Sequence, residues 1–220
     1  MERMTYEGNV FFLEKVRPEG KEYRIEGFQA SQEVLKVPGE VHGEPILEVD
    51  LREGEGGDLV KILKMPRQTQ WLFCGGGDFP ALSEVKVDEE NTVYSGQGRF
   101  LLSGDGEELL CVFSGDEEDK IIVPDSVLFI GPQAFRGTKS LHIEIENPNA
   151  EISPDAFDGS AFLASQDPMV ILGKTELFLL TRDVKRLILP EGLTKCHAHA
   201  FSRFCPDVMV AETLPPSSFF

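Results

Sequence analysis

Short apolar stretches recur along the chain, and each is followed closely by a proline. Four of them are Val34-Leu-Lys-Val-Pro38, Ile62-Leu-Lys-Met-Pro66, Ile121-Ile-Val-Pro124 and Leu187-Ile-Leu-Pro190. Apolar residues two positions apart point to the same side of a β-strand, and proline lacks the N–H that would continue the hydrogen-bond ladder. Each stretch therefore predicts one short strand that ends at its proline.

The strands belong to a longer repeat. Segments Ile121–Phe135 and Leu187–Phe201 share apolar first and third positions, a proline, a further apolar residue and a final Ala-Phe. Segment Ile143–Phe157 retains the apolar positions and the Ala-Phe, although its proline is displaced by two places. Phe135 and Phe157 are 22 residues apart, and Phe201 follows after 44, which is two periods. The repeating unit thus has about 22 residues.

A unit this short cannot bury its own apolar face, so neighbouring units must stack around a shared core. The expected fold is mainly β with short 3-10 or helical turns: a right-handed solenoid with a parallel sheet of short strands and inserted β-hairpins. The solenoid is expected to be right-handed because crossover connections between parallel strands are almost always right-handed. The prediction requires Phe135, Phe157 and Phe201 to lie along a common core.

Three hairpins are expected between or before the repeats. Arg99–Phe113 consists of two apolar runs around Gly104-Asp105-Gly106, and Val170–Leu180 is a shorter hairpin in an equivalent place. Apolar runs on either side of Arg17-Pro-Glu-Gly20 predict a hairpin that caps the open end of the stack. We therefore expect a cap and a first degenerate repeat over 1–50 and repeats with hairpin inserts over 51–220, in one continuous domain.

The segment Val123–Phe135 reads Val-Pro-x-x-Val-x-x-Ile-x-x-x-Ala-Phe. This pattern resembles the BspA-like leucine-rich repeats. The stretch Leu82–Ser95 with the following Ser103–Leu110 is similar to an insert between repeats in that family, and the stretch from Ile25 to Ile46 is similar to its opening. The resemblance implies a surface or secreted module for adhesion or protein interaction, with no catalytic residues.

Charge narrows the choice of partner. The net charge is −17, and the first 120 residues contain 26 acidic and 13 basic residues. Such a chain repels phosphate backbones and anionic lipids, so neither nucleic acid nor membrane insertion is expected, and the charge favours a monomer. No apolar run reaches the roughly 18 residues of a membrane span, and no secretory signal is present. We expect a cytoplasmic protein on the sequence as given, or a secreted or cell-surface one if the chain was trimmed.

Cys196, His197, His199 and Cys205 form the one cluster of residues that zinc accepts as ligands. Their spacing is poor, and Cys196 occupies the place of Ile130 in the repeat, which predicts a core residue. The two histidines are expected on a turn that faces water. We therefore expect no metal and no cofactor, while whether this cluster binds metal stays open.

Other candidate sites have simpler interpretations. Gly75–Asp78 lacks the spacing of a phosphate-binding loop, and Asp116–Asp119 is expected to be a solvated loop rather than a calcium site. The single tryptophan, Trp71, is interpreted as a core residue rather than a platform for a sugar. No nucleophile elbow or Ser/His/Asp set is present, so no enzymatic activity is expected.

The outward side of the predicted sheet is the candidate binding surface, because alternate strand residues there form an ordered array. The residues assigned inward are Val85, Val87, Ile121, Val123, Ile143, Ile145, Leu187 and Leu189. The residues assigned outward, as ligand-binding residues, are Glu84, Lys86, Lys120, Ile122, His142, Glu144, Arg186 and Ile188. This mixture of charged and apolar residues suits a protein or peptide partner. The alternative is a metal- or glycan-binding protein.

Overall fold

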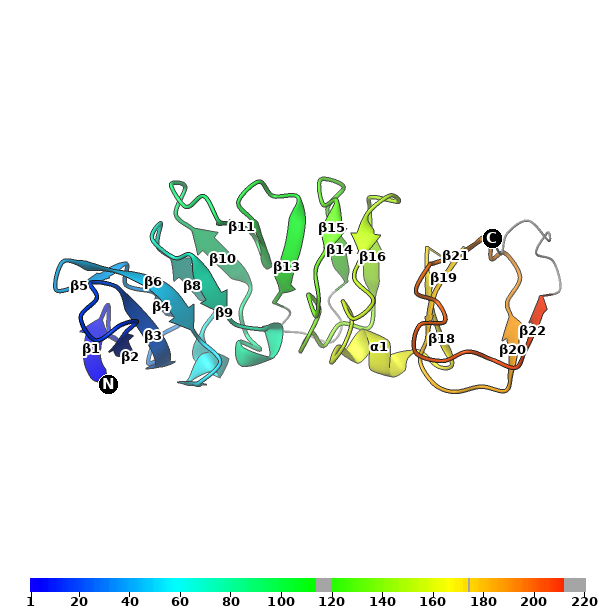
Figure 1. Cartoon of the computed structure of the whole chain (residues 1–220), viewed down its shortest axis with the longest axis horizontal. Helices are drawn as coiled ribbons and strands as arrows, with labels where there is room; N and C mark the ends of the chain where they lie inside the picture. The colour runs from blue at the N-terminus through cyan, green and yellow to red at the C-terminus, as the bar shows by residue number, and fades with distance from the viewer. Residues whose placement is uncertain (114–119, 174, 212–220) are drawn as a thin grey trace.

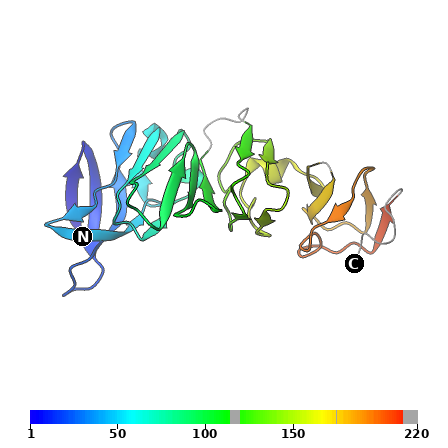
Figure 2. The same cartoon turned by 90° about the horizontal axis from the view of Figure 1, so that it is seen from above.

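The computed structural model describes residues 1–113, 120–173 and 175–211. The chain forms an elongated stack of short strands with its ends far apart (Figure 1, Figure 2). Among the described residues, helix is confined to α1 (Ala161–Ser165) and two 3-10 turns, η1 (Gly57–Leu59) and η2 (Gly76–Asp78). The prediction of a mainly β solenoid is confirmed.

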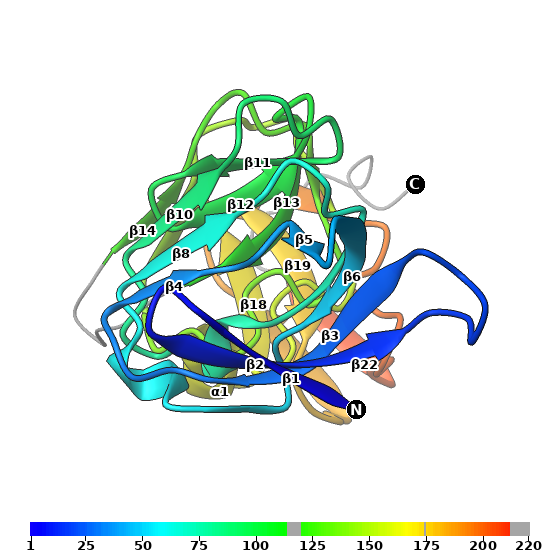
Figure 3. The same cartoon turned by 90° about the vertical axis from the view of Figure 1, so that its left-hand side faces the viewer.

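One side of the stack is a row of parallel strands that includes the four predicted from their prolines, and we call it the first row. Its strands are β4 (Val34–Lys36), β8 (Ile62–Met65), β10 (Glu84–Val87), β14 (Ile121–Val123), β16 (Ile143–Ile145), β20 (Arg186–Leu189) and β22 (Val208–Ala211). They pair in parallel as three separate sheets, β4-β8-β10, β14-β16 and β20-β22. Viewed from the N-terminal end, β4, β8 and β10 follow one another along this side (Figure 3).

A second row follows the first. Its strands are β6 (Glu44–Asp50), β9 (Trp71–Phe73), β13 (Glu108–Val112), β15 (Phe129–Ile130), β17 (Glu151–Ile152), β19 (Glu176–Leu180) and β21 (Lys195–Cys196). The parallel pairs here are β6-β9, β13-β15-β17 and β19-β21. Turns, η1 and η2 form the third side and return the chain to the first row. The two-residue strands β15, β17 and β21 were not predicted, because they are too short for an alternation to be recognised, whereas β13 and β19 belong to predicted hairpins.

The three predicted hairpins are present. β2 (Asn9–Lys15) pairs antiparallel with β3 (Tyr23–Gln29), β12 (Phe100–Ser103) with β13, and β18 (Met169–Leu172) with β19. Three further strands adjoin the cap, namely β1 (Glu2–Tyr6), β5 (Glu40–Val41) and β7 (Gly54–Glu55). A last one, β11 (Tyr94–Gln97), pairs antiparallel with β12. Most side chains of β1 are exposed, which explains why hydrophobicity gave no sign of it.

The predicted aromatic core is present, but one of its members differs. The rings of Phe135 and Phe157 stack with centroids 4.9 Å apart. The next contact is edge-to-face with Phe178, at 5.4 Å from Phe157, and not with Phe201. The 44-residue gap contains the β18-β19 hairpin instead of a regular repeat, so Phe178 of β19 occupies the expected position. Phe201 is half-buried against a separate cluster near the C-terminus.

The inward assignments in the first row are confirmed. Five of the eight side chains are at most 3% exposed, and Val87, Ile143 and Ile145 are half-buried against the core. The last two are less covered because β16 has a strand neighbour on one side only, with α1 where the next first-row strand would lie. Sheet pairing among the described residues joins no strand before α1 to a strand after it.

A buried asparagine ties consecutive units together. Asn91 is 7% exposed and donates through Nδ2 to the carbonyls of Pro66 (3.0 Å) and Thr69 (3.1 Å). Its Oδ1 accepts from the amides of Val93 (2.8 Å) and Tyr94 (2.9 Å). One amide group thus satisfies two carbonyls in the turn of one unit and two amides in the turn of the next.

Candidate binding surfaces

The predicted ligand-binding residues lie on one side of the stack but not on one sheet. Glu84 and Lys86 belong to β10, and Ile122 and Glu144 belong to β14 and β16. Lys120 and His142 immediately precede β14 and β16, and Arg186 and Ile188 belong to β20. The residues therefore form three patches, one for each first-row sheet.

The middle patch combines charge with an apolar side chain. Lys120 forms an ion pair with Glu144 across the β14-β16 pair, and Ile122 stands beside them with 43% of its surface exposed. On β20, Ile188 is 61% exposed. Ile122 and Ile188 are thus exposed apolar side chains on ordered strands, each among charged residues. These patches are therefore the apolar part of the candidate surface.

The first patch contains a lysine ladder, which we define as Lys36, Lys64 and Lys86. Sheet register places Lys64 directly beside Lys36 on one neighbouring strand and Lys86 on the other. Lys36 is paired with Glu7 at 2.9 Å and Lys86 with Glu84 at 3.1 Å, whereas Lys64 makes no ion pair with a described residue. Like charges side by side in a sheet are destabilising.

The lysine ladder borders a cleft of about 880 Å³, which Tyr6 and Arg67 also line. Sequence reasoning selected Lys86 alone. Lys36 and Lys64 each belong to a Leu-Lys dipeptide two residues before a proline. Alignment of these two repeats could have identified both lysines.

Trp71 corrects a prediction. It was interpreted as a core residue, but on β9 it is 49% exposed, and Phe73 on the same side of this strand is 43% exposed. The residue between them, Leu72, points inward and packs on the core, so alternation sends the two aromatic residues outward. The guanidinium of Arg52 lies 5.0 Å from the Phe73 ring centre. We call Trp71 and Phe73 the aromatic platform.

A larger cleft opens where the sheets are interrupted, and we call it the interruption cleft. It measures about 1290 Å³ and lies between β16 and β17 on one side and β18, β19 and β21 on the other. Its apolar lining comes from Ile143, Ile145, Phe162, Ile171 and Leu172. The charged residues on its rim include two ion pairs, Lys120–Glu144 and Lys195–Glu176.

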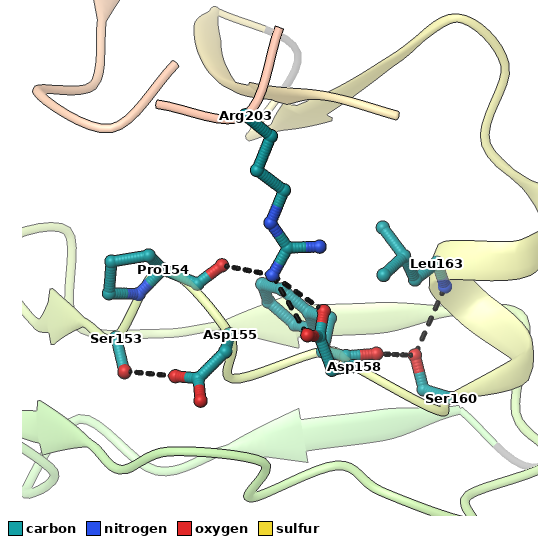
Figure 4. A network of polar contacts seen from close by, with 8 residues as sticks. Ser153, Pro154, Asp155, Asp158, Ser160, Leu163 and Arg203 are labelled. Atoms are coloured by element: carbon teal, nitrogen blue, oxygen red, sulfur yellow. Dashed lines mark hydrogen bonds and ion pairs between the residues drawn. The ribbon is translucent and has the colours of Figure 1, made fainter. Parts of the chain in front are cut away.

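Arg203 spans the interruption. Its Nη2 contacts both carboxylate oxygens of Asp158, at 2.8 and 2.9 Å, and the carbonyl oxygen of Pro154 at 3.2 Å (Figure 4). Arg203 comes from the turn after β21, whereas Pro154 and Asp158 follow β17. Beside them, Ser160 caps the start of α1 by accepting from the Leu163 amide at 3.1 Å. This contact joins the two parts that sheet pairing leaves separate.

Of the cysteine and histidine cluster, His197 and His199 lie together, with ring centroids 5.2 Å apart. Cys196 is half-buried against the C-terminal cluster, as predicted, whereas Cys205 is exposed. His197 does not face open water: its ring lies 4.9 Å from that of Phe178, and burial lowers its pKa. Within the described residues, no group of three or more His, Cys, Asp or Glu side chains could hold a metal ion. Asp116–Asp119 lies outside the described residues.

Cys74 and Cys111 are also free thiols. Burial raises the pKa of both, to about 12 for Cys111. A thiol that stays protonated is a poor nucleophile, so these two side chains act as small apolar residues of the core. No helix among the described residues has the length and apolar composition that crossing a membrane requires.

Comparison with known proteins finds no matching family model and no matching curated protein. Two similar solved structures are bacterial leucine-rich repeat proteins. One, a leucine-rich repeat protein from Eubacterium ventriosum, is 14% identical with a TM-score of 0.41, over 79% of this chain and 42% of its own. A leucine-rich cell surface protein from Faecalibacterium prausnitzii is 13% identical with a TM-score of 0.35, over 91% and 68%. The chain thus spans less than half of the Eubacterium protein, and at these scores we base no argument on the likeness.

Proposed function

We propose that this protein is a non-enzymatic interaction module of the BspA-like type, which binds a protein or peptide on the outward side of its first-row strands. The observation that carries the proposal is the exposure of Ile122 and Ile188 among charged residues on ordered strands. Protein interfaces combine an apolar centre with a polar rim, and these patches have that composition. Adhesion at a cell surface is one setting for such a module.

The lysine ladder supports the same function. Lys36 and Lys86 are in ion pairs with glutamates, whereas Lys64 stands between them without an ion pair to a described residue, in a chain of net charge −17. A partner whose contacting segment carries carboxylates would relieve the repulsion around Lys64. We therefore propose a partner with an acidic segment over β4, β8 and β10.

The experiment is a quantitative pull-down of partner proteins with the double variant Ile122→Glu and Ile188→Glu. The matched control is Leu128→Glu, because Leu128 is also half exposed, at 50%, but lies outside the first-row strands. The proposal predicts that a partner retained by the wild type and the control is lost with the double variant. Equal retention by all three proteins would remove the sheet face as the binding surface.

The aromatic platform favours a second candidate function, the binding of a glycan. Exposed aromatic rings give sugars a flat apolar surface on which to stack, and Trp71 and Phe73 lie side by side on β9. Glycan-array binding that is lost in Trp71→Ala and retained in the sheet-face double variant would support this function. Absence of binding by the wild type across the array would count against it.

A further inference from the structure

Two hairpin units of this chain are built on one plan. The β12-β13 and β18-β19 hairpins have the same register, and both contain a bulge at the same place. The matching pairs are Leu101–Cys111 with Val170–Leu179, and Leu102–Leu109 with Ile171–Leu177. The strand that follows each hairpin also attaches in the same way. The matching hydrogen bonds are Gly131 N to Leu109 O (2.9 Å) with His197 N to Leu177 O (2.8 Å), and Val112 N to Ala134 O (2.8 Å) with Leu180 N to Ala200 O (3.0 Å).

The two units differ in one strand. In the first unit, β11 pairs with the outer edge of β12 and fills the second row between β9 and β12. Its Tyr94 hydroxyl accepts from the Leu72 amide at 3.0 Å and donates to the Gln70 carbonyl at 3.2 Å, which joins β11 to β9. In the second unit, β18 pairs with β19 alone among the described strands. The position that corresponds to β11 is the interruption cleft.

Backbone groups point into the cleft from β17. The Glu151 amide donates to Leu128 O and the Ser153 amide to Ile130 O, each at 2.9 Å. Because neighbouring residues of a parallel strand bond to opposite sides, the amide and carbonyl of Ile152 face away from β15, toward the cleft. In the first unit, the Leu72 amide likewise points away from the preceding strand, and it donates to the Tyr94 hydroxyl.

Backbone groups also point into the cleft from β18. The Thr181 amide donates to Pro168 O at 2.9 Å, as the Phe113 amide does to Arg99 O at 3.0 Å. Alternation then directs the amide and carbonyl of Ile171 to the outer edge of β18. An unpaired strand edge of this kind is a template for another strand.

We propose that the interruption cleft binds an extended segment of a partner protein, which adds to β18 as an antiparallel strand in the place that β11 occupies in the first unit. Main-chain hydrogen bonds provide the attachment, as in other cases of strand addition. This site is separate from the sheet face of the proposed function, so either can fail without the other.

The internal example defines the chemistry of the segment. It carries a tyrosine in the place of Tyr94, where its hydroxyl reaches the Ile152 amide. We expect no carboxylate in the segment, because both lysines that line the cleft are already in ion pairs with glutamates. Apolar side chains on the inward side would cover Ile143, Ile145 and Leu172, which are half-buried.

The probe is a fluorescent synthetic peptide with the sequence of residues 91–98 of this chain, Asn-Thr-Val-Tyr-Ser-Gly-Gln-Gly, measured by fluorescence anisotropy against the whole protein. We expect saturable binding, weaker by about 5-fold for a peptide with phenylalanine in place of tyrosine, since one hydrogen bond is lost. Absence of saturable binding by the wild type overturns the proposal.

Two protein variants test the edge of β18. Ile171→Pro removes the outward N–H and should weaken peptide binding by about 10-fold or more, whereas Ile171→Ala keeps the N–H and should stay within about 3-fold. Equal binding by both overturns the proposal. Ile188→Glu, on the sheet face, should leave peptide binding unchanged, which separates this test from that of the proposed function.

Hydrogen exchange of the wild type answers the same question without a variant that could unfold. Peptide binding should slow exchange at the amides of β18 and at Ile152, and leave β12 unchanged. Faster exchange in β11 would mean that the peptide displaces it from β12, which overturns the proposal. If the wild-type chain dimerises through β18 and does not bind the peptide, the occupant of the cleft is a second copy of this chain. That result overturns the proposal as well.

Discussion

The phenylalanines of the core contact one another in pairs whose geometry changes along the stack. Phe28 and Phe79 are stacked at 5.4 Å, Phe79 and Phe113 meet edge to face at 6.2 Å, and Phe135 and Phe157 stack again. Each ring is at most 1% exposed. A repeat without a phenylalanine at this position would leave a void between its two neighbours, which neither could fill by a change of rotamer.

Replacement of Phe135 tests this packing. Phe135→Ala should lower the free energy of unfolding by about 3 to 5 kcal/mol, because a fully buried ring leaves a cavity lined by Phe157 and its neighbours. Urea denaturation measures the change. Leu128→Ala, at a half-exposed position, should change it by less than about 0.5 kcal/mol. A similar effect for both variants would mean that Phe135 is not a core residue.

A pH dependence follows from His197. Burial against Phe178 is the largest cause of its lowered pKa, so the folded protein takes up this proton less readily than the unfolded chain does. The resulting stability is complete above the unfolded pKa of about 6.5 and is lost as the pH falls through the lowered, folded pKa. His197→Phe should therefore lose less Tm than the wild type between pH 7.5 and pH 5. Parallel losses in the two proteins would contradict this account.

At the scale of elements, much of the first row was predictable and most of the second was not. Proline has no N–H to donate to a strand ladder, so the sequence alone predicts where β4, β8, β14 and β20 end. The two-residue strands β15 and β17 exist because a neighbour in the stack bonds to them, which no local pattern encodes. The interruption cleft was missed for the same reason. Trp71 was wrongly predicted to be buried because it lies in a degenerate repeat. No regular copy of the repeat indicated which side chains of β9 face outward.

The turns depend on polar side chains that satisfy backbone groups. Asn91→Ala would leave two carbonyls of one turn and two amides of the next without their partner, so we expect a loss of about 2 kcal/mol in the free energy of unfolding. Chemical denaturation monitored by circular dichroism checks the value. The control is Asn149→Ala, at an exposed position, which should leave stability nearly unchanged. A small effect of Asn91→Ala would show that water replaces the amide.

At the scale of the whole molecule, sheet pairing of the described residues divides the stack between β10 and β11 and again at α1. A backbone hydrogen bond from Val85 N to Gly98 O (2.7 Å) crosses the first join, whereas the two parts on either side of α1 share side-chain contacts. Phe157 and Phe178 touch across the interruption, and Arg203 reaches Asp158 beside it. The middle and last core clusters meet in this region, where Phe178 belongs to the middle cluster and its neighbour Leu177 to the last. Local stability can therefore differ along the chain, as in other repeat proteins.

Arg203→Ala should loosen the C-terminal part selectively. A partly exposed ion pair contributes roughly 1 kcal/mol or less, so the main effect is local: faster amide exchange in β19 and β21, with the first 113 residues unchanged. Hydrogen exchange with mass spectrometry resolves the two regions. Arg67→Ala, which removes the ion pair with Glu90, is the control and should leave β19 and β21 unaffected. Uniform acceleration along the chain would show that the parts unfold as one.

The absence of strand pairing across α1 among the described residues also has a mechanical consequence. Paired strands resist stretching through many backbone hydrogen bonds that must break together. The ring contact of Phe157 with Phe178 and the ion pair of Arg203 with Asp158 break one at a time. A molecule held at its two ends and stretched along the long axis in Figure 1 would therefore give way first at α1, at low force, while the sheets on either side stay intact. The molecule would then lengthen before the patches on the sheets were disturbed.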